Sequence, residues 1–375
     1  MKKSFADILS GIDSGLDRKL RDKLPAWADA GCRIPSKLAL EQCSSSLTAS
    51  YKAELASGAT TIADLTGGMG VDTHAFATTA RNVFYFERNQ ELAGMTAENF
   101  KLLGLDNVSV TNATIGPESD IPACDLIYLD PARRAADGSG RKVFLLEDCS
   151  PNLLELLPTL LDKAPRVMVK LSPMADISML SDRIPGLKEV HVVGVDGEVK
   201  ELLCIIGRDE DTALRITVCE LHKDGSRATM TFTPQEEASA ELILSPAPQV
   251  GDIIYEPAAS VMKAGCYRLL CGRWALEKLD RFTHIYIVPD SAGQDLPGKY
   301  HEIIGIMPFG KAAMKELAAR YPQADVTARN IPMTSEELRT RLKSTKKPAA
   351  DAAGIHIFAL TAGGAKTFLV TRRIR

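Results

Sequence analysis

Hydrophobic positions along the chain change their spacing near residue 58. The first 57 residues lack strand patterning, and five apolar residues recur there at helical spacing: Leu9, Ile12, Leu16, Leu20 and Leu24. Pro25 interrupts that pattern. A second helix is predicted from Ser36, after Pro35, through residue 57, with Gly58 in the position that favours helix ends. We therefore expect residues 1–57 to form a helical segment.

After residue 58, short apolar runs alternate with helical segments, which is typical of a parallel sheet covered by helices. A helix is expected between the second and third of these runs, at residues 90–103. A closing hairpin turns at Asp196–Gly197, because Asp-Gly between apolar runs favours a tight turn. The predicted strands cover residues 62–65, 82–87, 107–111, 126–129 and 166–171, followed by the two arms of the hairpin.

The rest of the chain predicts smaller α+β modules. A second hairpin is expected within residues 214–232, turning at Asp224–Gly225. Proline and glycine punctuate residues 245–300, where strands are expected at 252–257 and 284–289. The last part predicts three strands and a helix that starts at Thr334 or Ser335. The predicted domains are residues 1–57, 58–207, 208–300 and 301–375.

Charge is spread unevenly over the 375 residues. The net charge is −3, so the chain as a whole is not a basic nucleic-acid binder. Residues 301–375, however, carry 13 Lys and Arg against 6 Asp and Glu, a net of +7, and the remainder is acidic. A basic C-terminal module indicates a polyanionic partner. A solvated charged face would explain the same composition.

Cysteine usage and hydropathy favour a reduced, cytoplasmic setting. None of the eight cysteines forms a C-x-x-C pair, so we expect no metal site and interpret the thiols as small core residues. The first residues, MKKSFADILSGID, lack the apolar core of a signal peptide. No apolar run approaches a membrane span, so no membrane partner is expected.

The most informative stretch is TTIADLTGGMGVDT, residues 60–73, which predicts a strand, a glycine-rich turn and a helix. In α/β folds this arrangement forms the crevice that holds nucleotides, and glycine lets a ligand approach the backbone closely. A tight turn without a ligand is the alternative. The preceding helix enters beside the turn, so it either covers a sheet edge or presents polar residues to the crevice: Gln42, Ser44, Ser45 and Lys52.

Polar residues also follow the other predicted strands. Glu87 ends the second strand, where a carboxylate can accept hydrogen bonds from both ribose hydroxyls. The fourth strand delivers Asp130, Pro131 and Arg133 to the same edge of the sheet, and Arg134 follows them. Lys170 lies near the end of the fifth strand. The carboxyl ends of parallel strands are where open α/β sheets place their chemistry.

With DLTGGMG, the terminal Glu87, Asp-Pro-Ala-Arg and the closing hairpin, residues 58–207 resemble class I S-adenosylmethionine-dependent methyltransferases. The whole chain is similar to bacterial members with a C-terminal THUMP-like domain. The resemblance implies an α/β fold with a Rossmann-like seven-stranded sheet, an N-terminal helical segment and ferredoxin-like and THUMP-like C-terminal modules. It also implies which residues contact the cofactor. Glu87 would hold the ribose, and Asn112 would lie near the adenine. The methionine part would be contacted by the strand end and the turn, at Asp64, Gly67, Gly68 and Gly70. Ala113 stands where many members have an acid.

A nicotinamide dehydrogenase is the competing interpretation of the glycine turn. Its G-x-G-x-x-G pattern requires a third glycine in register, which is absent after GGMGVD, and Asp-Pro-Ala-Arg has no role in hydride transfer. The methyltransferase interpretation is therefore preferred.

Three acceptors remain open. Methylation at C5 of a pyrimidine usually needs a cysteine that adds to the base, but neither the Asp130 loop nor the end of the Lys170 strand carries one, although Cys149 lies nearby in sequence. An exocyclic base amine could donate its N–H groups to Asp130 and to the carbonyl of Pro131, although Ala132 and Arg133 depart from the related Asp-Pro-Pro-Tyr motif.

A ribose hydroxyl would require a Lys-Asp-Lys-Glu tetrad: Lys52, Asp130, Lys170 and Glu201 or Glu198. Structural ion pairs are the alternative for both lysines. We rank the base amine first, with Asp130, Pro131, Arg133 and Lys170 as the candidate catalytic residues.

The THUMP-like resemblance implies a structured RNA, such as a tRNA or rRNA, as the substrate. Lysine and arginine contacts to phosphate would supply affinity without sequence information, and we expect them from Arg134, Lys346, Lys347 and Arg372. The alternatives are a structural cap or dimer contact for the C-terminal module, and a catalytically weak RNA-binding protein for the whole chain.

Overall fold

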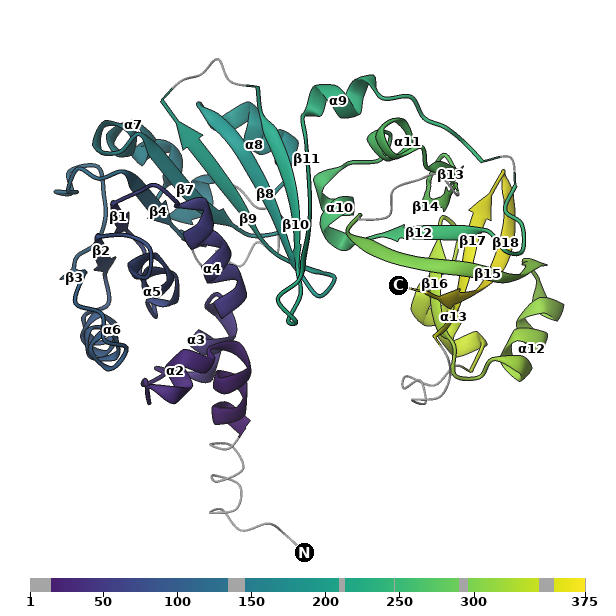
Figure 1. Cartoon of the computed structure of the whole chain (residues 1–375), viewed down its shortest axis with the longest axis horizontal. Helices are drawn as coiled ribbons and strands as arrows, with labels where there is room; N and C mark the ends of the chain where they lie inside the picture. Colours follow the sequence, from purple (N-terminus) through teal and green to yellow (C-terminus); the bar gives the residue numbers. More distant parts are fainter. Residues whose placement is uncertain are drawn as a thin grey trace, which may run out of the picture. The chain divides into compact units, whose positions relative to one another are not determined.

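The structure is a computed structural model that describes residues 15–133, 146–208, 213–245, 247–289, 296–343 and 354–374. The chain divides into two compact units. The first contains residues up to Val193 together with Lys200–Leu214, and the second contains Gly194–Val199 and Arg215–Arg375. Figure 1 shows the elements of both units.

Residues 15–23 are helical, and the first unit continues with the alternation that the sequence predicts. Its helices are α2 (Pro25–Asp29), α3 (Lys37–Gln42), α4 (Ser46–Leu55), α5 (Val71–Ala77), α6 (Gln90–Leu102), α7 (Leu153–Lys163) and α8 (Ile177–Arg183), with a short 3₁₀ turn, η1 (Leu146–Asp148). Its strands are β1 (Thr61–Asp64), β2 (Asn82–Glu87), β3 (Val108–Asn112), β4 (Leu126–Leu129), β5 (Ala132–Arg133), β6 (Cys149–Ser150), β7 (Arg166–Leu171), β8 (Leu187–Val195) and β9 (Glu198–Gly207).

Seven strands of this sheet lie in the order β8-β9-β7-β4-β1-β2-β3. Strand β1 pairs in parallel with β2 on one side and with β4 on the other, and β3 and β7 extend the parallel run. Strand β9 is antiparallel to β7. The chain order therefore reverses at β1, and a crevice opens there beyond the carboxyl ends of the strands.

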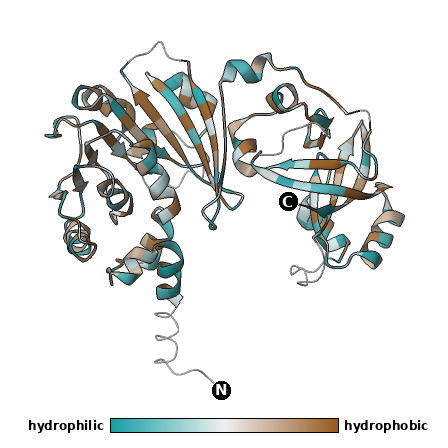
Figure 2. Cartoon of the chain, in the orientation of Figure 1, coloured by the Kyte–Doolittle hydropathy of each residue, from teal (hydrophilic) through white to brown (hydrophobic). Residues whose placement is uncertain are grey.

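Helices α4, α5 and α6 pack on one face of this sheet. Phe76 of α5 and Ala53 of α4 pack against Ile62 and Tyr128 of the central strands. Phe100 of α6 packs edge-on against Tyr85 of β2, with the ring centroids 5.5 Å apart. Figure 2 shows hydrophobic residues recurring along the strands of the sheet, as a sheet covered on both faces requires.

The single helix predicted from Ser36 to residue 57 is wrong, because the chain forms two helices there. Ser36 caps α3, and Cys43 leaves the helix with an extended ψ of 163°. Ser45 then caps α4 in a reciprocal capping box with Thr48. Serine side chains compete for backbone hydrogen bonds in this way, so the Ser44–Ser45 pair ends one helix and starts another.

The closing hairpin is confirmed. Strands β8 and β9 are neighbours joined at Asp196–Gly197, where φ is +50° and +85°. Two successive residues with positive φ form the turn that matches the twist of two antiparallel strands, and the Asp-Gly sequence supplies both.

The second unit also has a mixed α/β structure. Its strands are β10 (Arg215–Leu221), β11 (Arg227–Phe232), β12 (Ile253–Pro257), β13 (Glu277–Asp280), β14 (Thr283–Val288), β15 (Gly298–Pro308), β16 (Asp325–Arg329), β17 (Ile355–Ala362) and β18 (Ala365–Arg373). Its helices are α9 (Pro234–Ser239), α10 (Ala259–Ala264), α11 (Leu269–Trp274), α12 (Lys311–Arg320) and α13 (Ser335–Arg341). A seven-stranded sheet runs β13-β14-β12-β15-β18-β17-β16.

Strand β15 lies at the centre of this second sheet and was not predicted. It pairs with β12 on one side and with β18 on the other. It also crosses residue 300, where the predicted domain boundary falls. The predicted hairpin β10–β11 and the predicted helix α13, capped by Thr334, are both present. Among the described residues, no helix is long and apolar enough to cross a membrane.

Candidate functional site

Four charged side chains from four parallel strands meet at the crevice beyond β1. Asp64 ends β1, Glu87 ends β2, Asp130 follows β4 and Lys170 lies in β7. They border one pocket of about 340 Å³, which is within the size range of small-molecule sites. The glycine turn forms another part of its wall, with Gly67, Gly68 and Gly70.

The glycine turn is held by its own contacts. The Gly68 N–H donates to Glu87 Oε2 at 3.0 Å, and the Tyr85 hydroxyl donates to the Gly68 carbonyl at 2.6 Å. A Cβ on Gly67 would lie 2.0 Å from the Tyr85 ring, and one on Gly70 would lie 2.6 Å from Phe100. Gly67 and Gly70 are thus required by packing. Gly68 has a φ of +54° and open space around its Cβ position.

Asp64 is buried at the base of the pocket. Its carboxylate accepts hydrogen bonds from the Thr73 hydroxyl at 2.6 Å and from the Thr66 N–H at 3.1 Å. Burial raises the pKa of Asp64 to about 7, and the nearby acids Asp72 and Asp130 add to the rise while these two hydrogen bonds oppose it. Near neutral pH this carboxyl group therefore responds to any cation placed beside it.

Asp130 and Lys170 form an ion pair at the edge of the pocket. Lys170 Nζ lies 2.5 Å from Asp130 Oδ2, and the Asp130 N–H donates to the Thr66 hydroxyl at 2.6 Å. The following residues pair as β5 with β6, so Ala132 lies opposite Ser150, and both border the pocket. The Asp130 loop is thereby tied to the glycine turn on one side and to β6 on the other.

Lys170 is held in its charged form. Burial by itself would lower its pKa, but the carboxylates of Asp130, Asp72 and Glu201 outweigh burial and raise the pKa above its ordinary value. A lysine in this state donates hydrogen bonds and does not accept a proton near neutral pH.

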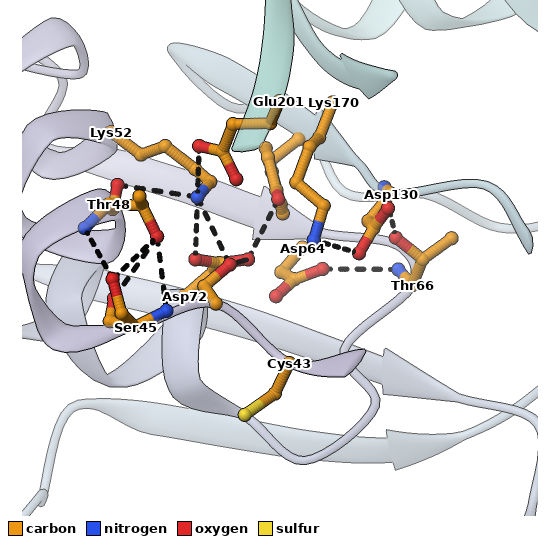
Figure 3. A network of polar contacts seen from close by, with 12 residues as sticks. Cys43, Ser45, Thr48, Lys52, Asp64, Thr66, Asp72, Asp130, Lys170 and Glu201 are labelled. Atoms are coloured by element: carbon orange, nitrogen blue, oxygen red, sulfur yellow. Dashed lines mark hydrogen bonds and ion pairs between the residues drawn. The ribbon is translucent and has the colours of Figure 1, made fainter. Parts of the chain in front are cut away.

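A second group of charged residues, Lys52, Asp72 and Glu201, lies beside this pair (Figure 3). Lys52 of α4 is fully buried, and its ammonium donates to Glu201 Oε1 at 2.7 Å and to the Ser44 hydroxyl at 3.1 Å. It also lies 3.2 Å from Asp72 Oδ1. Asp72 Oδ2 accepts hydrogen bonds from Ser44 and from the Tyr128 hydroxyl, at 2.9 and 2.8 Å.

The two carboxylates of this cluster differ in their acidity. Burial would raise the pKa of Asp72, but Lys52, Lys170 and the two hydroxyl donors outweigh it, so the pKa is lowered. Burial dominates at Glu201, whose pKa is raised despite its contact with Lys52. Asp72 is therefore the carboxylate that stays ionised most readily.

Of the predicted site residues, seven border the pocket: Asp64, Gly67, Gly68, Gly70, Glu87, Asp130 and Lys170. Asn112 does not. Its amide donates to the backbone carbonyls of Glu87 and Arg88, so it fixes the end of β2, and Ala113 borders the pocket instead. The adenine contact assigned to Asn112 stays a prediction.

The other predicted residues lie in varied settings. Pro131 is buried, and the backbone of Arg133 pairs with Cys149 in the β5–β6 ribbon. Arg372 is exposed on β18 and lies 3.7 Å from Glu302. Arg134, Lys346 and Lys347 fall outside the residues that the structure describes. The roles assigned to these residues stay predictions.

The tetrad hypothesis placed Lys52, Asp130, Lys170 and Glu201 together, and the structure brings them together as two ion pairs. Of the polar residues before the turn, Gln42 and Ser44 border the pocket, whereas Ser45 caps α4 and Lys52 is covered.

Sequence reasoning missed Asp72 and Tyr128, which complete the cluster. An acid in the first turn of a helix is normally explained by its favourable interaction with the helix dipole. The sequence therefore carried no signal that Asp72 was buried. All eight cysteines are free, and every one except the half-buried Cys43 is buried. Cys43 borders the pocket, and burial raises the pKa of its thiol.

The residues present fit S-adenosylmethionine. The open space over Gly68 lets a ligand approach the backbone of the turn, and the acids around the pocket suit a ligand that carries a sulfonium and an ammonium group. Asp72 Oδ1 is buried without a hydrogen-bond donor, which a cationic ligand would relieve. Asp64 and the turn would hold the methionine part, and Glu87 the ribose.

Comparisons with known proteins agree with this geometry. Residues 254–293 match a ferredoxin-like domain family, and residues 298–373 match a THUMP-like domain family. Among solved structures, a protein described as a putative methyltransferase from Porphyromonas gingivalis W83 is 31% identical, with a TM-score of 0.85. The match covers 96% of this chain and 89% of that chain. No curated protein matches the sequence.

Two further structures share only part of the fold. A SAM-dependent methyltransferase from Aquifex aeolicus is 16% identical, with a TM-score of 0.33, and covers 46% of this chain and 94% of its own. An rRNA methylase from Streptococcus thermophilus is 16% identical, with a TM-score of 0.30, and covers 43% of this chain and 95% of its own. These two likenesses carry no weight here. The full-length match and the C-terminal domain families are decisive, and the chain belongs to the bacterial class I S-adenosyl-L-methionine-dependent methyltransferases with a C-terminal THUMP-like domain.

Proposed function

We propose that this methyltransferase modifies an exocyclic amine of a base in a structured RNA. The observation that carries the proposal is the Asp130–Lys170 ion pair, which borders the same pocket as the glycine turn. The pair supports the proposal, because a carboxylate that can accept N–H bonds borders the pocket that would hold the methyl donor.

Methyl transfer to an amine requires the protein to align the nitrogen with the methyl group and to supply one proton acceptor. When bound, S-adenosylmethionine supplies an electrophilic methyl group and leaves as a neutral thioether. Asp130 accepts an N–H bond from the amine, which directs the nitrogen lone pair towards the methyl group, and takes the proton that the nitrogen loses. The Pro131 carbonyl follows directly and is the second candidate acceptor. Lys170 pairs with Asp130 and fixes the position of its carboxylate.

Methylation of a ribose 2′-hydroxyl is the second candidate, because the four tetrad residues do converge. The state of Lys170 argues against it. A lysine that removes a hydroxyl proton needs a lowered pKa, whereas three carboxylates outweigh burial and leave the pKa of Lys170 raised. Lys52 is covered on all sides and cannot reach an acceptor. We therefore interpret both lysines as structural partners of the acids.

An RNA acceptor is supported by the THUMP-like match and by charge. Residues 301–375 carry a net charge of +7, and several of their basic side chains are exposed on the second unit: Lys311, Lys315, Arg320, Arg329, Lys343, Lys366 and Arg372. Contacts to phosphate would supply sequence-independent affinity. A structured RNA must then unstack the target base for it to reach the pocket.

Turnover and cofactor binding of Asp130→Asn test this proposal against a catalytically weak RNA-binding protein. We expect transfer of labelled methyl to RNA to fall by about 10²-fold or more, the usual size of a lost general base, with cofactor affinity within about threefold of the natural protein. Asp106→Asn, an exposed acid outside the pocket, is the matched control and should keep full turnover. Full turnover in Asp130→Asn would remove Asp130 from the chemistry.

A further inference from the structure

The charge cluster around the pocket is not balanced. Two ammonium groups, those of Lys52 and Lys170, face three carboxylates, those of Asp72, Asp130 and Glu201. The two ion pairs are not separate, because Lys170 also interacts with Asp72 and Glu201. Figure 3 shows all five side chains gathered beside the glycine turn. With all five groups charged, the cluster carries one negative charge in excess.

Asp72 is where that excess meets the pocket. Oδ2 is saturated by the hydroxyls of Ser44 and Tyr128. Oδ1 has no hydrogen-bond donor, since Lys52 lies 3.2 Å away but not in hydrogen-bond geometry, and Lys52 is already bound to Glu201. The residue is only 9% exposed, and it is one of the residues that border the pocket.

Both features call for a positive charge from outside the protein. A buried carboxylate oxygen without a donor costs free energy, and an unpaired buried charge costs more. A cation in the pocket would offset the excess charge, because in a partly buried site its attraction to the carboxylate is screened much less than in water. The methyl donor is a sulfonium cation, whereas the product of its reaction is a neutral thioether.

We propose that Asp72 is a further specificity-determining residue, which recognises the positive charge of the methyl donor and so favours the donor over its neutral product. This inference rests on the cofactor of the family and is independent of the RNA acceptor proposed above. It gives the cluster a purpose in the reaction cycle, since attraction to the bound cofactor weakens once the methyl group has left and the product can exchange for fresh donor.

Binding measurements without any acceptor test the proposal. Calorimetry on the full chain would compare S-adenosylmethionine, S-adenosylhomocysteine and sinefungin, in which a protonated amine replaces the sulfonium. We expect Asp72→Asn to weaken binding of both cationic ligands by about tenfold, the size of one modest charge interaction, and to leave binding of S-adenosylhomocysteine within about twofold.

Tyr128→Phe is the matched control, because it removes a hydrogen bond from Asp72 Oδ2 without changing any charge. We expect it to affect the three ligands alike. A thermal melt shows whether Asp72→Asn is folded. If it is not, Glu201→Gln neutralises the excess charge from the other side of Lys52 and should weaken only the cationic ligands, by about threefold.

Equal weakening of all three ligands by Asp72→Asn would make Asp72 a structural residue and overturn the proposal. Unchanged affinities would overturn it as well. Neither result would touch methyl transfer to RNA, which is measured separately.

Discussion

Asp64 and Asp72 are buried carboxyl groups on either side of the same glycine turn, yet their surroundings move their pKa values in opposite directions. At Asp64, burial and the nearby acids Asp72 and Asp130 outweigh the two hydrogen bonds and raise the pKa. Asp72 meets Lys52 and Lys170, so its pKa is lowered despite burial. The charges of neighbouring side chains, more than the extent of burial, therefore decide which of the two acids is ionised.

This difference predicts that cofactor affinity depends on pH through Asp64. An ammonium or sulfonium group beside Asp64 favours the ionised carboxylate, so binding and loss of the Asp64 proton are linked. The pKa of Asp64 in the free protein is about 7. Cofactor affinity should therefore level off above pH 7 and fall by up to tenfold for each pH unit below it. Calorimetry between pH 5.5 and 7.5 measures this change.

Asp64→Asn is the control for the other titrating groups in the pocket. It should bind the cofactor more weakly near pH 7 and show a flatter profile below it. An equally steep profile in the variant would assign the pH dependence to another acid, and Glu201, whose pKa is also raised, would be the first to examine.

At the scale of single elements, the break between α3 and α4 shapes the pocket. Ser45 and Thr48 satisfy each other's backbone N–H groups, at 3.2 and 3.1 Å, and so start α4 with only three residues between it and the end of α3. The segment between the two helices supplies Cys43 and Ser44 to the pocket wall. A continuous helix would have placed these residues elsewhere.

Ser45→Ala should therefore reduce both stability and cofactor affinity. Loss of the cap costs about 1 kcal/mol in the free energy of unfolding, measured by urea denaturation. Thr334→Ala removes an equivalent capping box from α13 in the second unit and is the matched control. It should cost a similar free energy and leave cofactor affinity unchanged. Equal cofactor affinity in both variants would show that the α3–α4 break does not position the pocket wall.

How far the elements could be predicted depended on their surroundings. The strands of the first sheet are short apolar runs that are buried on both faces, so hydrophobicity alone locates β4 and β7 at their observed bounds. Strand β15 begins at Gly298 and ends at Pro308, and its turn-forming residues masked the strand pattern. The helix predicted over 36–57 failed because periodicity does not register a serine cap.

The candidate site was predictable to the extent that strand ends locate it. Asp64, Glu87, Asp130 and Lys170 follow from the rule that parallel strands place chemistry at their carboxyl ends. Asp72 and Tyr128 could not be found this way. Their importance arises from contacts between α4, α5, β4 and β9, which are distant in sequence.

At the scale of the whole molecule, the two units divide the proposed tasks. The first contains the cofactor pocket and the Asp130–Lys170 pair. The second contains the ferredoxin-like and THUMP-like matches and the basic C-terminal residues, which we propose contact RNA phosphates.

Replacing Lys346 and Lys347 with alanine in the full chain tests the proposed RNA contacts. Each lost phosphate contact should reduce the slope of log affinity against log salt by about 0.7 to 0.9, so the double variant should lose up to about 1.8. Affinity should fall for all RNA sequences alike, since phosphate carries no sequence information. Titrations at several salt concentrations measure the slope, and an unchanged slope would remove these lysines from the RNA contact.

The most direct test of the account is the identity of the methylated nucleoside. Purified protein would be incubated with S-adenosylmethionine carrying a labelled methyl group and with fractionated cellular RNA, and the digested nucleosides would be separated by mass. The account predicts label on the exocyclic nitrogen of a base, and loss of that label in Asp130→Asn. Label on a ribose oxygen would contradict the amine mechanism and restore the Lys52–Asp130–Lys170–Glu201 tetrad. No label in any RNA fraction, with cofactor binding intact, would contradict the RNA substrate itself.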